Sequence, residues 1–215
     1  APHLPAIELR PLLRGWLHLV CAVIAVPAGA VLVRHADGSR AAVGAAVYSV
    51  GMVAMFGVSA TYHRIRWTAR TRPWLKRADH AAIFVMIAGS YTPLCLVTLR
   101  DTFGSWLLAG VWAGTALGVL GAFTGIAEKR IIGLVAYSAL GWAAAVAMPA
   151  LFSRLGGWNF ALLVAGGVLY SGGSVILGTK RPRGVPHVFG YHEIWHVFVV
   201  VAVVLHFIVV WDVVG

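Results

Sequence analysis

Residues 187–211 read "HVFGYHEIWHVFVVVAVVLHFIVVW". The run from 193 to 212 is almost entirely apolar, and about 20 such residues cross the hydrocarbon core of a bilayer as a helix. His192 and His196 stand four residues apart where this run begins. An ionisable side chain at that depth is costly unless it has a partner or a role. The segment therefore predicts a transmembrane helix that carries a polar site at one end.

The rest of the chain repeats this apolar pattern. Of its 215 residues 60% are hydrophobic and only 11% are charged, whereas a soluble domain is usually about one quarter charged. Short connections hold nearly all the charges, so we predict one all-α integral membrane domain over residues 1–215. We expect a seven-transmembrane helix bundle without a separate soluble domain or a cleavable signal peptide. The expected spans are 15–33, 41–62, 80–99, 103–127, 131–153, 155–179 and 193–212.

The basic residues are distributed unevenly between the connections. Thirteen of the 17 lysines and arginines fall on the side of the N-terminus: Arg10, Arg14, Arg64, Arg66, Arg70, Arg72, Lys76, Arg77, Lys129, Arg130, Lys180, Arg181 and Arg183. The other four are Arg34, Arg40, Arg100 and Arg154. Positive residues favour the cytoplasmic side, so we predict a cytoplasmic N-terminus, an outside C-terminus and a multi-pass protein of the cell (inner) membrane. The net charge of +10 then reflects topology and anionic lipid head groups, and we expect no nucleic-acid partner.

Further polar residues fall at the ends of other predicted spans. The second span finishes with "GVSATYHR", in which Ser59 and His63 are four residues apart and share a helix face. The third begins with "RADHAAIFVMIAGSYTPL", which places Asp79 at its start. The predicted topology brings these ends to the cytoplasmic boundary together with His192 and His196. We therefore expect the five side chains to meet at one depth.

Three of these side chains form a plausible metal-ligand set. Neutral imidazoles from His63, His192 and His196 with one water would give a tetrahedral zinc site that keeps an open position. We favour Zn²⁺ because iron and manganese prefer more oxygen ligands. Zinc lowers the pKa of its water to about 7. Asp79 is then the expected proton acceptor or orienting partner, and the Ser59 hydroxyl could bind the water or a substrate oxygen.

The letters "HEIWH" also match the zinc-protease pattern H-E-x-x-H, whose third ligand follows downstream. The downstream candidates His206 and Asp212 lie about 15 Å and about 24 Å along a continuous helix, too far to share the ion. Glu193 is rotated about 100° from His192. We therefore disfavour a membrane protease and take the third ligand from His63.

Several other histidines and both cysteines are not expected to be metal ligands. His18, in "RGWLH", is either hydrogen-bonded on its own or placed beside the ligands. His80 has a structural role by default, and His206 is expected to bond a neighbouring helix. Cys21 and Cys95 both fall in apolar runs, which argues against a disulfide framework and a zinc–thiolate cluster.

The motifs "SATYH", "DHAAIFVMIAGSYTPL" and "HEIWH", in this order, resemble the bacterial hemolysin III branch of the progestin and adipoQ receptor (PAQR) superfamily. The resemblance covers essentially all seven predicted helices. It implies a cytoplasmic N-terminus and a zinc ion held by His63, His192 and His196, with Asp79 and Ser59 beside it. Two departures are Ser90, where many relatives have Thr, and "RGWLH", which lacks an Asn that many relatives carry in this helix.

The resemblance also suggests an activity. The superfamily includes alkaline ceramidases, which implies a hydrolase of a lipid amide or ester, with membrane lipids as partners, that acts in membrane homeostasis. Two alternatives remain: a receptor-like or sensor protein with a structural zinc, and a pore-forming cytolysin. The second is disfavoured because the spans lack a polar stripe that could line a channel. Substrate identity, oligomeric state and the route into the site do not follow from the sequence.

Overall fold

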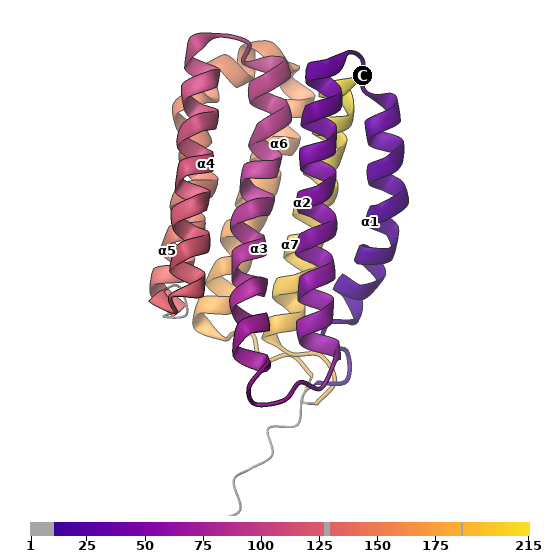
Figure 1. Cartoon of the computed structure of the whole chain (residues 1–215), viewed down its shortest axis with the longest axis vertical. Helices are drawn as coiled ribbons and strands as arrows, with labels where there is room; N and C mark the ends of the chain where they lie inside the picture. Colours follow the sequence, from indigo (N-terminus) through magenta and orange to yellow (C-terminus); the bar gives the residue numbers. More distant parts are fainter. Residues whose placement is uncertain (1–10, 127–129, 186) are drawn as a thin grey trace, which may run out of the picture.

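The computed structural model describes residues 11–126, 130–185 and 187–215, which are helical apart from turns, loops and one isolated bridge between Val185 and Phe189. In Figure 1 the long helices run side by side along the long axis of the molecule. The elements are α1 (Trp16–His35), α2 (Ser39–Arg64), α3 (Arg72–Pro93), the π-helix η1 (Leu94–Thr98), α4 (Thr102–Phe123), α5 (Arg130–Gly141), the 3₁₀ helix η3 (Trp142–Ala147), α6 (Met148–Thr179) and α7 (Tyr191–Val214).

Six helical stretches are long and apolar enough to cross a membrane: Trp16–His35, Ser39–Arg64, Arg72–Thr98, Thr102–Phe123, Ile131–Thr179 and Tyr191–Val214. The prediction of an all-helical multi-pass membrane protein is confirmed, but the count of seven spans is not. The expected spans 131–153 and 155–179 both lie within Ile131–Thr179, because α5, η3 and α6 follow one another without a coil. Gly156, with φ 74° and ψ 160°, interrupts this stretch. Residue 127, the expected end of the fourth span, lies outside the described residues.

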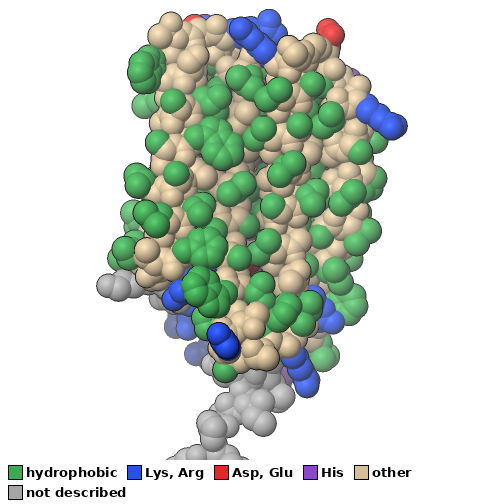
Figure 2. Space-filling view, viewed as in Figure 1, with side chains coloured by type: hydrophobic (Ala, Val, Ile, Leu, Met, Phe, Trp, Pro, Cys, Tyr) green, Lys and Arg blue, Asp and Glu red, His purple; other side chains and the backbone are tan. Residues whose placement is uncertain are grey.

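The outer surface of the bundle is apolar. Large hydrophobic side chains are exposed along the whole height of the face seen in Figure 2, whereas Lys and Arg gather toward its two ends. Only 17% of the most apolar window of α4 is buried inside the protein, and 33% of that of α7. Soluble monomers rarely expose apolar patches of this extent. The pattern is that of helices whose outer faces contact lipid.

The two ends of the bundle differ in charge. We call the end where α2 and α6 finish and α3 and α7 begin the basic end. Its described lysines and arginines are Arg14, Arg64, Arg66, Arg70, Arg72, Lys76, Arg77, Lys180, Arg181 and Arg183. The opposite end carries Arg34, Arg40, Arg100 and Arg154, together with Asp37, Asp101 and Asp212. This asymmetry is the structural counterpart of the charge distribution that predicted the topology, and the cytoplasmic N-terminus itself stays a prediction.

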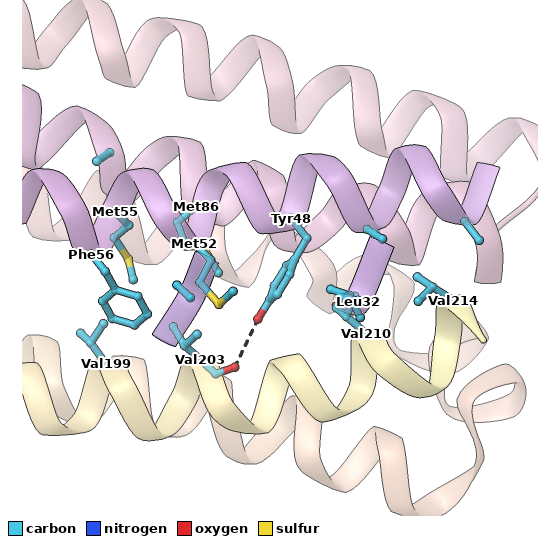
Figure 3. Close-up of a cluster of buried hydrophobic side chains, with 14 of the residues drawn as sticks. Leu32, Tyr48, Met52, Met55, Phe56, Met86, Val199, Val203, Val210 and Val214 are labelled. Carbon is cyan, nitrogen blue, oxygen red and sulfur yellow. Dashed lines mark hydrogen bonds between the residues drawn. The ribbon is translucent and has the colours of Figure 1, made fainter. Parts of the chain in front are cut away.

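The main apolar core lies between α1, α2, α3 and α7 (Figure 3). Tyr48 of α2 is fully buried in it, and its hydroxyl donates a 3.2 Å hydrogen bond to the carbonyl of Val203 in α7. A buried tyrosine needs such a partner for its polar end. Phe56 and Val199 continue the same α2–α7 contact toward the basic end. The core therefore fixes the register of the two helices that carry the predicted histidine ligands.

Candidate metal centre

The predicted ligands sit on helix ends that meet at the basic end. His63 lies in the last turn of α2, and His192 and His196 lie in the first two turns of α7. Gly15, just before α1, has a φ of 78°, and a Cβ added there would lie 2.7 Å from the Cβ of His63. Only glycine fits this left-handed position without strain. The start of α1 can therefore cross directly over His63 and cover the cluster.

The three histidines converge as expected. One nitrogen from each of His63, His192 and His196 lies within 4.8 Å of the other two. The Nε2 atoms of His63 and His192 are 3.2 Å apart. Ligand nitrogens of a tetrahedral zinc with bonds of 2.0–2.1 Å are separated by about 3.3 Å. The convergence of the three residues is thus confirmed, and their spacing fits one shared ion.

The surroundings also suit a metal. His63 and His196 are buried, with 9% and 3% of their surface exposed, and His192 is half-buried. The donor set is three imidazoles without a thiolate, which matches a zinc site with a position left for water or substrate. The residues present therefore fit zinc. The identity of the ion stays a prediction.

Asp79 and Ser59 lie beside the cluster. The Oδ2 atom of Asp79 is 3.9 Å from Nε2 of His63, which exceeds hydrogen-bond length but suits a bridging water. Ser59 is buried and also lies next to Asp79. The structure thus places both predicted catalytic side chains at the site, and their roles in catalysis stay predictions.

His18 joins the site more closely than the sequence indicated. Its Nδ1 atom and the Ser59 hydroxyl form a 2.8 Å hydrogen bond, and its ring stacks on His196 with centroids 3.8 Å apart and planes 10° from parallel. Its buried Nε2 has no hydrogen-bond partner among the described residues. The sequence could predict the depth of His18 in the membrane, since α1 begins at the same end as the ligands. It could not predict that α1 lies next to α2 and α7, and this packing is what brings His18 to the cluster.

Glu193, the acidic residue of "HEIWH", has a structural task. It is buried, forms an ion pair with Arg14, and accepts a 2.7 Å hydrogen bond from the backbone N–H of Gly190, which caps α7. These contacts hold its carboxylate on the segment before α1. The geometry gives no support to a protease in which this carboxylate acts as the base.

The remaining histidines of α3 and α7 also have places in the bundle. His206 donates a hydrogen bond of 3.1 Å from Nε2 to the Leu163 carbonyl of α6, as expected for a histidine that bonds a neighbouring helix. It lies deep in α7, so it contributes nothing to the cluster. His80 lies on α3 and lines the cavity beside Asp79. It is therefore a neighbour of the site, and its structural role stays a prediction.

A cavity of about 410 Å³ opens beside the cluster. It is lined by His18, Ser59, Asp79, His192 and His196, among others. A second, mostly apolar cavity of about 130 Å³ lies deeper between α3, α5, α6 and α7. The two cavities share the side chains Met55, Ile83, Tyr137 and Trp195 as walls. A polar chamber thus adjoins a space suited to hydrocarbon.

Comparison with known proteins places the chain among haemolysin-like membrane proteins. The family described as "Haemolysin-III related" matches residues 8–207. "Hemolysin-3" of Bacillus cereus is 36% identical over 188 residues, 85% of this chain and 81% of that protein. "Hemolysin-3 homolog" of Bacillus subtilis (strain 168) is 31% identical over 185 residues, 85% of this chain and 84% of that protein. "Monocyte to macrophage differentiation factor" of Homo sapiens is 25% identical over 203 residues, 91% of this chain and 81% of that protein.

Proposed function

This chain belongs to the haemolysin III-related family, and from its site we propose that it is a zinc-dependent hydrolase of a lipid amide or ester that acts in membrane homeostasis. One observation carries the proposal: three histidines converge to within 4.8 Å, and two of them, His192 and His196, line a cavity that Asp79 and Ser59 also line. A structural metal site needs no such cavity. A site that must admit a substrate does.

The proposal includes a topology of seven crossings with a cytoplasmic N-terminus in the inner membrane. A straight helix of 49 residues would be about 74 Å long, far more than the roughly 30 Å of a hydrocarbon core. Division at Gly156 gives segments 131–155 and 157–179, each longer than the roughly 20 residues that one crossing needs. The charge of the basic end supports its cytoplasmic placement.

The chemistry divides between the ion and the chain. Zinc, when bound, supplies Lewis acidity, which polarises a carbonyl and makes water more acidic. His63, His192 and His196 would hold it. Asp79 lines the same cavity and is placed to take a proton and return it to the leaving group. Ser59, oriented by its hydrogen bond to His18, is placed to bind an oxygen of the substrate.

The apolar cavity supports a lipid as the substrate. Its wall includes Met86, Leu94 and Leu163, and it shares four wall residues with the polar chamber. A hydrocarbon chain placed there would position an amide or ester at the cluster. The adjoining cavities are consistent with membrane lipids as the partner.

Metal analysis of the purified protein tests the site. We expect about one zinc per chain in the native protein, and its loss in His63→Ala because two imidazoles hold the ion far more weakly than three. The control is His35→Ala, an exposed histidine at the opposite end. Equal metal content in the two variants would contradict the site.

Asp79→Asn separates the hydrolase from a receptor-like or sensor protein with a structural zinc. The second candidate has one observation in its favour: the Asp79 carboxylate lies 3.9 Å from His63, close to where a fourth ligand would close the site. For a hydrolase we expect Asp79→Asn to keep its zinc while turnover falls about 10²-fold or more. Metal analysis of the purified Asp79→Asn variant measures its zinc, and lipid profiling of cells that carry the variant measures its turnover. A normal lipid profile with reduced zinc would favour the structural role.

The pore-forming alternative gains no support from the described part of the chain. The main cluster between α1, α2, α3 and α7 is apolar. A water-filled path would need polar side chains along the whole length of the bundle.

A further inference from the structure

Tyr137 of α5 belongs to the wall that the polar cavity and the apolar cavity share. On the same helix, Gly133 and Leu134 line the polar cavity, whereas Ser138 and Gly141 line the apolar one. These positions recur at intervals of three and four residues, so they lie along one face of the helix. Tyr137 therefore stands at the level where the two cavities meet.

The hydroxyl of Tyr137 is buried and has no hydrogen-bond partner among the described residues. A buried hydroxyl without a partner costs free energy, so buried tyrosines normally have one. Tyr48 and Tyr91 follow this rule, since their hydroxyls donate to the carbonyls of Val203 and Gly141. The unpaired hydroxyl of Tyr137 marks a position that a bound molecule can satisfy.

The ring of Tyr137 is supported from one side. Phe84 of α3 packs against it, with ring centroids 4.6 Å apart and planes at 52°. Phe84 is only 2% exposed and lies against Gly118 of α4, where an added Cβ would come within 2.4 Å of its ring. Because α4 approaches so closely, Phe84 has little room to withdraw. Tyr137 thus presents its hydroxyl from a packed, preorganised position.

Asp79 stands opposite Tyr137. The two side chains line the polar cavity from α3 and α5. The Tyr137 hydroxyl lies within electrostatic reach of the Asp79 carboxylate, although the two groups form no hydrogen bond with each other. A group bound between them would donate a hydrogen bond to the carboxylate and accept one from the hydroxyl. An alcohol oxygen and an amine nitrogen both have this double character.

We propose that the Tyr137 hydroxyl donates a hydrogen bond to the leaving atom of the scissile ester or amide. The assignment adds a catalytic residue to the proposed hydrolase and therefore rests on that function. As Asp79 gives its proton to the leaving oxygen or nitrogen, the bond from that atom to the acyl carbon breaks and the electron pair stays on the leaving atom. Tyr137 keeps its own proton and stabilises the charge that develops there, so its contact strengthens in the transition state.

Two esters with the same acyl chain test the contact in the purified, zinc-loaded, full-length protein in neutral detergent. Nitrophenolate departs readily from p-nitrophenyl octanoate, whereas ethoxide needs help to leave ethyl octanoate. We expect Tyr137→Phe to lower kcat about tenfold or more for the ethyl ester, with KM little changed, and less than about twofold for the nitrophenyl ester. An equal effect on both esters, or none, would overturn the proposal.

Tyr170→Phe is the matched control, because Tyr170 lines the apolar cavity and not the polar one. We expect it to leave the ratio of the two rates unchanged. A change of that ratio as large as in Tyr137→Phe would show a disturbed cavity and refute the contact. If the native protein hydrolyses neither ester, the proposed hydrolase fails and the leaving-atom role fails with it. If it hydrolyses both and Tyr137→Phe keeps the ratio, only the role of Tyr137 is refuted.

Thermal unfolding without substrate gives a second, independent measurement. We expect Tyr137→Phe to keep or raise the midpoint, because its hydroxyl has no described partner to lose. Tyr48→Phe should lower the midpoint, because it removes the bond to the Val203 carbonyl. Zinc content should equal that of the native protein in both variants. A fall in Tyr137→Phe as large as in Tyr48→Phe would give the hydroxyl a structural task and overturn the proposal.

Discussion

The two ends of the bundle each contain a stacked aromatic pair with almost the same geometry. His18 stacks on His196 at 3.8 Å and 10°, and His35 stacks on Trp211 at 3.8 Å and 9°. The first pair is buried beside two further histidines, Ser59 and a cavity, whereas His35 is exposed to solvent at the far end. A stacked pair by itself therefore does not indicate a functional site. The His18–His196 pair is distinguished by its burial and by the other polar side chains next to it.

The ion pairs at the two ends of the bundle also differ in burial. Arg14 and Glu193 join the segment before α1 to the start of α7, and the Glu193 side chain is only 3% exposed. Arg154 and Asp101 pair at 2.9 Å at the opposite end, with both side chains more than 40% exposed. Removal of one partner from a buried pair leaves an uncompensated charge, whereas water replaces a lost partner at the surface. The two ends should therefore respond differently to the same kind of change.

The largest difference is expected between His196→Ala and His35→Ala. With zinc at about 1,000 times its dissociation constant, the ion stabilises the folded protein by about 4 kcal/mol, and His196→Ala forfeits that contribution. His35→Ala should leave it intact. Thermal unfolding in detergent, with zinc and with a chelator, measures both. A chelator effect that survives in His196→Ala would show that this histidine is not a ligand.

The next effect concerns the buried ion pair. Arg14→Gln leaves the Glu193 carboxylate buried with the Gly190 N–H as its hydrogen-bond donor. Because the Arg14 side chain is partly exposed, we expect a loss of about 3 kcal/mol in the free energy of unfolding, at the lower end for a buried pair. Chemical denaturation in mixed micelles measures it. The double variant Arg14→Met with Glu193→Gln should recover most of the loss, because neither charge remains. No recovery would mean that Arg14 stabilises through packing alone.

A smaller effect is expected from Arg154→Gln. This change removes a hydrogen bond to the Thr98 carbonyl and the pairing with Asp101, all at an exposed site. We expect its denaturation midpoint to stay much closer to that of the native protein than the midpoint of Arg14→Gln does. A loss as large as that of Arg14→Gln would remove the distinction between the two ends.

The smallest effect concerns pH at the opposite end. The Gly104 N–H and the Arg154 guanidinium hold the pKa of Asp101 below its usual value. The folded pKa is therefore the lower one, so the stabilisation is complete above about pH 4 and is lost as the pH falls through the lowered pKa. Midpoints between pH 5 and pH 3 should fall slightly less in Asp101→Asn than in the native protein. If the midpoint fell equally with pH in both proteins, protonation of Asp101 would not be coupled to unfolding.

Much of the fold and part of the site followed from local pattern. Apolar stretches of bilayer length predicted the helices, and the spacing of His192 and His196 put both on one face of α7. The basic residues predicted which helix ends meet, and this brought His63 into the ligand set. Each of these inferences depends on neighbours along the chain or on a sum over many residues, so it needed no coordinates.

Other features depended on contacts between distant segments. Nothing in "HEIWH" reveals that Glu193 pairs with a residue 179 positions away. The place of His18 required the lateral packing of α1, and the lack of a coil between α5 and α6 concealed a helix boundary that hydropathy alone had placed near residue 154.

Residue order alone thus determined that this chain is a helical membrane protein with imidazoles gathered at one boundary, because hydropathy and helical period act locally. Three-dimensional packing decided which polar groups face the cluster, which pair with one another, and that two adjoining cavities lie beside it. Those properties arise from side chains of several helices meeting in space, and no periodicity along one helix encodes them.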